Sequence, residues 1–191
     1  MRFPKPLAYI DTETTGLDPT VAEVIEFALI RVDLDGHEQR WQTKIKPERI
    51  EDAHPKALEV NGYTPEAWVD APAMAEVAPV IIESLEGCVL VGHNVSFDEA
   101  MLKANIKRTG VKGRVPYHKL DTVTLAFEHL FPLGLKSASL DAIREFLGWS
   151  KFGAHTAMKD TEDAKRLHEL LSQAGRRTRL KIQLQRRLLG L

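Results

Sequence analysis

Hydrophobic and polar positions along the chain follow patterns typical of strands in its first half. The apolar run Leu7–Thr12 ends at acidic residues, as a buried strand often does. Glu23–Val32 is rich in β-branched and aromatic residues, and Gln39–Ile45 alternates between polar and apolar positions. Asp35-Gly36 between them is a turn signal, which predicts a hairpin. Two more short strands are expected, at Cys88–Gly92 and Tyr117–Asp121.

Apolar residues at helical spacing occupy most of the remaining chain and predict helices between and after these strands. The expected helices lie near residues 54–60, 74–85, 96–107, 122–130, 137–147 and 156–173. Ser137 or Ser139 could cap the fifth of them. Three strands followed by strands that alternate with helices predict an α/β fold with a mixed sheet. The length of 191 residues suits one domain with at most a short appendage.

Composition narrows the class of protein. Hydrophobic residues make up 43% of the chain and charged residues 28%, as in a soluble globular protein. Its single cysteine, Cys88, excludes an internal disulfide and a zinc site built from several cysteines. No apolar run approaches the ~20 residues that span a bilayer. The charged start MRFPKPLAYID has no export-signal pattern, so a cytoplasmic protein is expected.

Charge is distributed unevenly along the chain. The net charge is −1, but residues 175–191 hold six basic residues and no acids, which leaves −7 for residues 1–174. We therefore divide the chain into a body, residues 1–174, and a basic tail, residues 175–191. Leucines every four residues in the tail (Leu180, Leu184, Leu188) predict a short helix. This helix could pack on the body by its leucines, contact nucleic acid, or dock onto a larger partner.

The segment Asp11-Thr12-Glu13-Thr14-Thr15-Gly16 carries the first candidate chemistry. Residues two apart in a strand point to the same face, so the carboxylates of Asp11 and Glu13 lie side by side at the end of a strand. Like charges this close are costly unless a cation or a proton intervenes. Hard oxygen ligands favour Mg²⁺ or Mn²⁺. The alternative is a solvated acidic pair at a strand–turn junction.

Two later segments carry further candidates. Asp98, in GHNVSFD, falls in the first turn of a helix that follows a strand, where the helix dipole alone would favour an acid. His155 stands in a loop of small residues, and Asp160 lies in the helix after it. The neighbouring acids Glu162 and Asp163 are read as solvated. None of the seven histidines forms a close ligand pair, so a histidine zinc site is not expected.

Taken in this order, the three segments resemble the motifs of the DnaQ-like, or DEDDh, family of 3′→5′ exonucleases. Asp11 and Glu13 match its first motif, Asp98 its second, and His155 with Asp160 its third. The resemblance covers roughly residues 7–174. It implies the ribonuclease-H-like fold, an α/β fold with a mixed five-stranded sheet and helices on both sides. It also implies DNA replication or repair as the setting.

The resemblance implies a chemistry as well. The four carboxylates of Asp11, Glu13, Asp98 and Asp160 would hold two divalent metal ions, Mg²⁺ or Mn²⁺. Such a pair can activate a water molecule and stabilise the leaving 3′ oxygen. His155 would be the general base, since an imidazole titrates near physiological pH. The expected reaction releases nucleoside 5′-monophosphates from single-stranded 3′ ends, with DNA preferred.

Substrate contacts follow from the same resemblance. The terminal nucleotide would lie against residues of the first motif, of the segment HPKALEVNGYTPE and of the second motif: Thr14, Thr15, Gly16, Leu17, Asn61, Tyr63, His93, Asn94 and Phe97. Tyr63 stands where the family more often has an aliphatic residue. A DNA polymerase or another replication protein is a candidate partner for the tail. Three alternatives stay open: an exoribonuclease that trims RNA, a phosphatase, and an inactive nucleic-acid-binding module.

Overall fold

The five strands form one mixed sheet. The computed structural model describes residues 4–172 and 176–188, and for residues 176–181 only the backbone. The strands run in the order β3-β2-β1-β4-β5, where β2 is antiparallel to β1 and β3, and β4 is parallel to β1 and β5. Their bounds are β1 Leu7–Thr14, β2 Val24–Val32, β3 Glu38–Lys44, β4 Val89–Gly92 and β5 Lys119–Asp121. The predicted mixed five-stranded sheet is confirmed.

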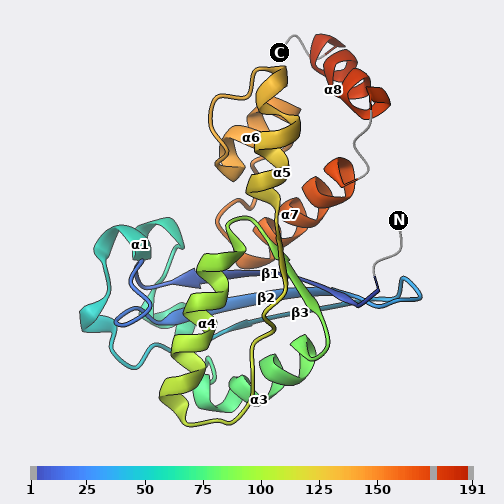
Figure 1. Ribbon diagram of the computed structural model, residues 1–191. Coiled ribbons are helices and arrows are strands. Elements are labelled where there is room, and N and C mark those ends of the chain that lie inside the picture. The colour runs from blue at the N-terminus through green and yellow to red at the C-terminus, as the bar shows by residue number, and fades with distance from the viewer. Residues whose placement is uncertain (1–3, 173–175, 189–191) are drawn as a thin grey trace.

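Helices cover both faces of this sheet (Figure 1). Helices α3 and α4 pack on one face, and α7 packs on the other with α5, α6 and α8 grouped around it. The α-helices are α1 Pro55–Val60, α2 Pro65–Trp68, α3 Met74–Leu85, α4 Val95–Thr109, α5 Thr122–His129, α6 Leu140–Leu147, α7 Ala157–Leu171 and α8 Arg176–Leu188. Two short 3₁₀ helices are η1 Ile50–Asp52 and η2 Phe131–Leu133.

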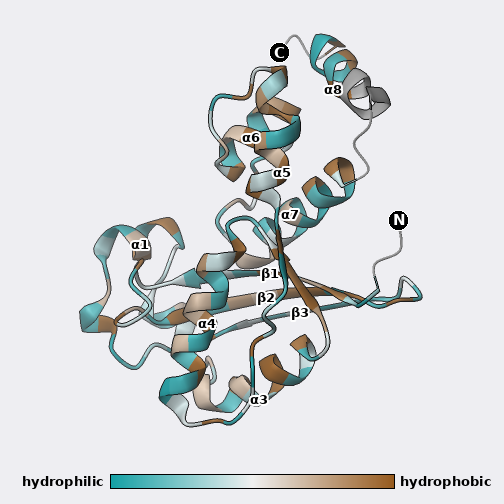
Figure 2. Cartoon of the chain, in the orientation of Figure 1, coloured by the Kyte–Doolittle hydropathy of each residue, from teal (hydrophilic) through white to brown (hydrophobic). Residues whose placement is uncertain are grey.

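The side-chain alternation of the central strand β1 divides the core between these faces. Ala8 and Ile10 belong to the hydrophobic cluster beneath α3 and α4. Leu7 and Tyr9 point the other way and share a cluster with Met158 of α7. Figure 2 shows hydrophobic residues along the strands of the sheet and on α3. Because successive residues alternate, the odd-numbered residues that follow Tyr9 also face α7.

Several bounds differ from the sequence prediction for local reasons. Strand β1 continues to Thr14, because its pairing with β2 extends through the acidic residues to a register shift between Glu13 and Thr14. Helix α2 was not predicted, since four residues are too few to show helical spacing. Thr64 caps it by accepting a hydrogen bond from the Ala67 amide at 3.2 Å. Of the two serines predicted as possible caps, Ser139 is the one that caps α6.

The tail helix α8 contacts the body differently from the leucine packing considered above. Ile182 is 3% exposed and packs in the cluster of α5, α6 and α7. The Arg186 guanidinium lies 3.5 Å from the centre of the Phe146 ring and donates to the Phe146 carbonyl at 3.0 Å. Leu184 and Leu188 are 58% and 80% exposed, so packing by these two leucines is wrong. The side chain of Leu180 lies outside the described residues.

In the part of the chain that the structure describes, no helix is long and apolar enough to cross a membrane.

Candidate active site

Three carboxylates converge where the centre of the sheet meets α7. Asp11 and Glu13 belong to β1, and Asp160 lies in the first turn of α7. One oxygen from each lies within 4.8 Å of the others. The alternation of β1 explains this, because Asp11 and Glu13 continue the Leu7–Tyr9 series on the face that α7 covers. The predicted side-by-side placement of the first two acids is therefore observed.

Burial and mutual repulsion make this cluster hard to ionise without a cation. The pKa of Glu13 is raised to about 8, first by burial and then by the charges of Asp160 and Glu26. The pKa of Asp11 is raised well above its ordinary value, first by burial and then by Asp98. A divalent cation would stabilise the ionised forms, and three hard oxygen donors fit Mg²⁺ or Mn²⁺. The donor set therefore suits a metal site.

Asp98 reaches the site from the opposite face of the sheet. It is 3% exposed in the first turn of α4, and its Oδ1 accepts from the Thr12 amide at 2.9 Å and the Thr12 hydroxyl at 2.7 Å. Strand β4 pairs with β1 only as far as Tyr9, which leaves the Thr12 amide to Asp98. Burial raises the pKa of Asp98 to about 7, although these hydrogen bonds oppose the rise. Asp98 thus neighbours Asp11 but is not one of the three clustered acids.

A buried arginine holds Asp160 from behind. Arg144 of α6 has no exposed surface, and its Nη2 lies 2.5 Å from Asp160 Oδ1. The same oxygen accepts the backbone N–H of His155 at 3.3 Å. Both donors use Oδ1. Arg144 and the His155 backbone thereby restrict the orientation of the Asp160 carboxylate beside Asp11 and Glu13.

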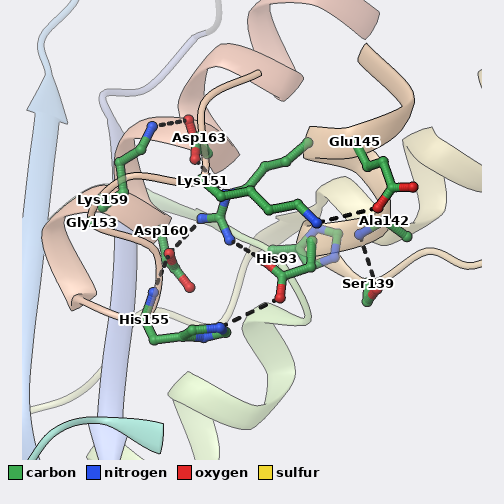
Figure 3. A network of polar contacts seen from close by, with 12 residues as sticks. His93, Ser139, Ala142, Glu145, Lys151, Gly153, His155, Lys159, Asp160 and Asp163 are labelled. Carbon is green, nitrogen blue, oxygen red and sulfur yellow. Dashed lines mark hydrogen bonds and ion pairs between the residues drawn. The ribbon is translucent and has the colours of Figure 1, made fainter. Parts of the chain in front are cut away.

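Arg144 binds two further acids. Its Nε donates to Asp163 Oδ2 and its Nη1 to Asp141 Oδ1, each at 2.8 Å. Asp163 is 2% exposed, so the interpretation of Asp163 as solvated is wrong: it accepts from Arg144 and from Lys159. Figure 3 shows Lys159 and Asp163 joined on the side of Asp160 away from His155. The Glu162 side chain is 42% exposed and pairs with Arg40 at the surface.

Arg144 was missed although the sequence carries a signal for it. Leu140, Arg144 and Leu147 follow helical spacing, which puts the arginine on the apolar face of α6. A charge at such a position is almost never fully buried unless it is paired. That pattern predicts buried carboxylate partners, but it does not say which ones.

His155 lies at the rim of the cluster, in the loop before α7. Its backbone is left-handed, with φ of 64°, and its side chain is 47% exposed. Its Nε2 is 3.4 Å from Asp141 Oδ2, so Asp141 links the imidazole to Arg144. Phe152, three residues earlier, is 91% exposed and was not considered from the sequence.

The first group of predicted substrate residues forms a tight turn after β1. The Thr14 hydroxyl donates to the Gly16 carbonyl at 2.7 Å, and the Thr15 hydroxyl accepts from the Glu23 amide at 2.8 Å. These hydroxyls therefore shape the turn. Leu17 projects from it and is 83% exposed, as an apolar group that contacts a base would be.

Asn61 and Tyr63 support this turn from the side. The Asn61 amide donates to the Thr14 carbonyl at 3.1 Å, and Asn61 Oδ1 accepts from the Tyr63 backbone at 3.2 Å. The Tyr63 ring packs against Trp68 with 5.1 Å between ring centres. Tyr63 is only partly exposed, so this contact uses much of its aromatic surface.

The predicted residues near Asp98 brace the connection between β4 and α4. His93 donates from Nε2 to the Ala138 carbonyl at 2.6 Å, and its Nδ1 lies 2.9 Å from the Thr122 hydroxyl. Asn94 is left-handed with φ of 67° and exposed, and Phe97 packs against the α3–α4 core. Both ring nitrogens of His93 are therefore engaged within the protein.

Comparison with known proteins places this geometry in a family. Residues 9–167 match the RNase_T model, described as an exonuclease. The DNA polymerase III epsilon subunit of Aquifex aeolicus is 35% identical over 152 residues, which are 79% of this chain and 72% of that protein. The PolC-type DNA polymerase III of Thermotoga maritima is 36% identical over 79% of this chain, which spans only 11% of that relative.

Solved structures show the same fold. Exonuclease I of E. coli, solved with a dT13 oligonucleotide, superposes with a TM-score of 0.75 at 21% identity, over 88% of this chain and 41% of that one. An apo form of exonuclease I gives 0.74 at 22% identity, over 91% of this chain and 43% of that one. The sheet with helices on both faces is thus the ribonuclease-H-like exonuclease fold, and the chain belongs to the RNase_T exonuclease family, as the DnaQ-like motifs had indicated.

Proposed function

We propose that the chain is a metal-dependent 3′→5′ exonuclease that releases nucleoside 5′-monophosphates from single-stranded ends, with DNA preferred. The observation that carries this proposal is the convergence of Asp11, Glu13 and Asp160 within 4.8 Å, next to a buried Asp98. Membership of an exonuclease family supports the reaction class. The polarity and the substrate are inferred from the motifs and from relatives whose names are DNA polymerase subunits.

Asp11, Glu13, Asp98 and Asp160 would hold the metal ions, two in number by our proposal. Mg²⁺ or Mn²⁺ held by these carboxylates would supply an activated water and stabilisation of the charge on the leaving 3′ oxygen. The chain's own contribution is to hold the carboxylates in place. Arg144 fixes Asp160, and Thr12 fixes Asp98, before any substrate arrives. Such pre-organisation avoids reorganising the site during the reaction.

His155 would act as the general base. It follows Gly153 and Ala154 and is half-exposed, so its side chain can turn toward the cluster without displacing core residues. Its backbone N–H contact with Asp160 keeps the base beside a proposed metal ligand. Near neutral pH an imidazole can take a proton from water and pass it to solvent.

The terminal nucleotide would lie on the turn after β1. Leu17, at 83% exposure, offers an apolar surface for its base. The remaining predicted contacts shape or support this turn, or brace the connection between β4 and α4. Phe152 at the rim adds a second exposed surface. We therefore propose that eight further residues shape the substrate site: Thr14, Thr15, Gly16, Asn61, Tyr63, His93, Asn94 and Phe97.

A replication or repair partner, a cytoplasmic location and the division at residue 174 remain predictions. The relatives named above are DNA polymerase III proteins, and the exposed Leu184 and Leu188 of α8 are available for contact.

Digestion of matched single-stranded DNA and RNA oligonucleotides tests the proposal. Purified protein with Mg²⁺ should release mononucleotides from DNA faster than from RNA, and EDTA should abolish release. Asp11→Asn, which removes one charge at the centre of the cluster, should be inactive. Faster digestion of RNA would instead identify an exoribonuclease, and full activity of the variant would refute the metal mechanism.

A further inference from the structure

A basic surface lies at the far end of α4 from the acidic site. Lys103, Lys107, Lys112 and Arg114 line a pocket of about 630 Å³ at the end of α4 and the loop that follows. A second pocket of about 470 Å³ shares Arg114 and adds Lys5 and His118. The lining of the two pockets holds five lysines or arginines against one acid, Glu86. This concentration of positive charge contrasts with the net charge of −7 on residues 1–174 as a whole.

Most of these cations have no carboxylate partner in the part of the chain that the structure describes. Lys103 pairs with Glu99 at 2.6 Å, and Lys119 also contacts Glu99. Among the described residues, no carboxylate oxygen lies within 4.0 Å of Lys107, Lys112 or Arg114. All three side chains are exposed. Their charge is therefore available to an anionic ligand.

An exposed aromatic ring stands beside these charges. Tyr117 lines the second pocket and is 79% exposed, with its ring edge-on to His118 at 5.6 Å between centres. Proteins that bind single-stranded nucleic acid combine exposed aromatic rings with cations. The bases stack on the rings, and the phosphates pair with the cations. An acidic protein partner would be attracted by the cations alone, so the exposed ring favours a nucleic acid as the ligand.

We propose that this surface binds the phosphodiester backbone of single-stranded nucleic acid, away from the nucleotide being cleaved. Asp98 and Lys107 lie on the same helix nine residues apart, or about 14 Å at 1.5 Å per residue. The surface thus holds a strand whose 3′ end occupies the acidic site, and in that respect it rests on the proposed function. Short substrates that fill only the site do not reach it.

The test is binding of a fluorescent single-stranded DNA in EDTA, measured by anisotropy over a range of salt concentrations. Lys112→Glu/Arg114→Glu should lower the affinity about tenfold and reduce the slope of log affinity against log salt by about 1.4, for two lost phosphate contacts. Arg40→Glu/Lys46→Glu is the matched control, with the same charge change on an exposed arginine and an exposed lysine in and just after β3. It should retain more affinity for the DNA and a steeper salt slope than the Lys112/Arg114 variant. Tyr117→Ala should weaken binding without changing the slope.

Hydrolysis separates this proposal from the proposed function. With Mg²⁺, the Lys112/Arg114 variant should cleave oligonucleotides of about 4 nucleotides at the normal rate but lose efficiency on those longer than about 16. Equal binding by this variant and the control variant would overturn the proposed binding surface, even if both variants cleave DNA. If the Lys112/Arg114 variant binds more weakly but the unmodified protein cleaves no DNA, the binding surface stands and the proposed exonuclease activity is refuted.

Discussion

Arg144 Nη2 lies 2.5 Å from Asp160 Oδ1, so a fully buried cation holds a carboxylate that belongs to the acidic cluster. The same guanidinium binds Asp141 and Asp163. Breaking a buried ion pair by removing one partner costs about 3–5 kcal/mol, because the remaining charge is buried alone. Arg144 therefore serves both the stability of the α6–α7 contact and the orientation of Asp160.

Arg144→Met tests the stability component of this role. We expect the free energy of unfolding to fall by about 3–5 kcal/mol, since Asp160 loses its cation and the buried Asp163 is left with Lys159 alone. Urea denaturation measures the change. Unchanged stability would show that the three ion pairs contribute nothing to the folded state.

The double variant Arg144→Met/Asp163→Asn tests the orientation component. It removes the charge of the buried Asp163, which has lost Arg144, while Lys159 can still donate to the new amide. Part of the lost stability should therefore return. Hydrolysis should remain slow because Asp160 is still released. Recovery of the full rate together with stability would mean that Arg144 acts on folding alone.

His155→Ala tests the proposed general base. We expect the turnover rate to fall about 10²–10⁴-fold, the usual contribution of general acid–base catalysis, with little change in stability because the side chain is half-exposed. His37→Ala is the matched control, since it removes an exposed histidine from the turn between β2 and β3, outside both the acidic cluster and the basic surface. Single-turnover rates with saturating enzyme measure both. Equal rates for the two variants would remove His155 from the mechanism.

The raised carboxyl pKa values predict how stability depends on pH without metal. Glu13 has a pKa of about 8 against an ordinary 4.5, so between these values the folded state holds a proton that the unfolded state has lost. The free energy of unfolding should therefore fall as pH rises from about 4.5 to about 8. Asp98, with a pKa of about 7, acts in the same direction.

Thermal melting in EDTA and in Mg²⁺ measures this effect. In EDTA we expect the melting temperature to fall by on the order of 5 °C across this range, and the stabilisation by Mg²⁺ to grow with pH as the ligands ionise. Glu13→Gln should flatten the EDTA curve, because it removes the carboxyl group whose pKa is raised to about 8. A Mg²⁺ effect that shrinks with rising pH would contradict a carboxylate metal site.

Local pattern was sufficient to predict the sheet, most helices and the grouping of Asp11 with Glu13, because strand alternation fixes which residues share a face. The contacts of Asp98 were not predictable, since they depend on β4 ending its pairing at Tyr9 and leaving the Thr12 amide free. Asp163 was misread for a similar reason. Its burial follows from the packing of α6 against α7, and a single helix cannot show that a neighbouring helix supplies an arginine.

The most direct measurement of the central claim compares one single-stranded DNA carrying its label at either end, digested with Mg²⁺. The account predicts that 3′ label appears at once as mononucleotide, while 5′ label passes through a ladder of progressively shorter strands, and that Asp160→Asn abolishes both. Early release of the 5′ label as mononucleotide, cleavage inside the strand, or an unimpaired Asp160→Asn variant would contradict the account.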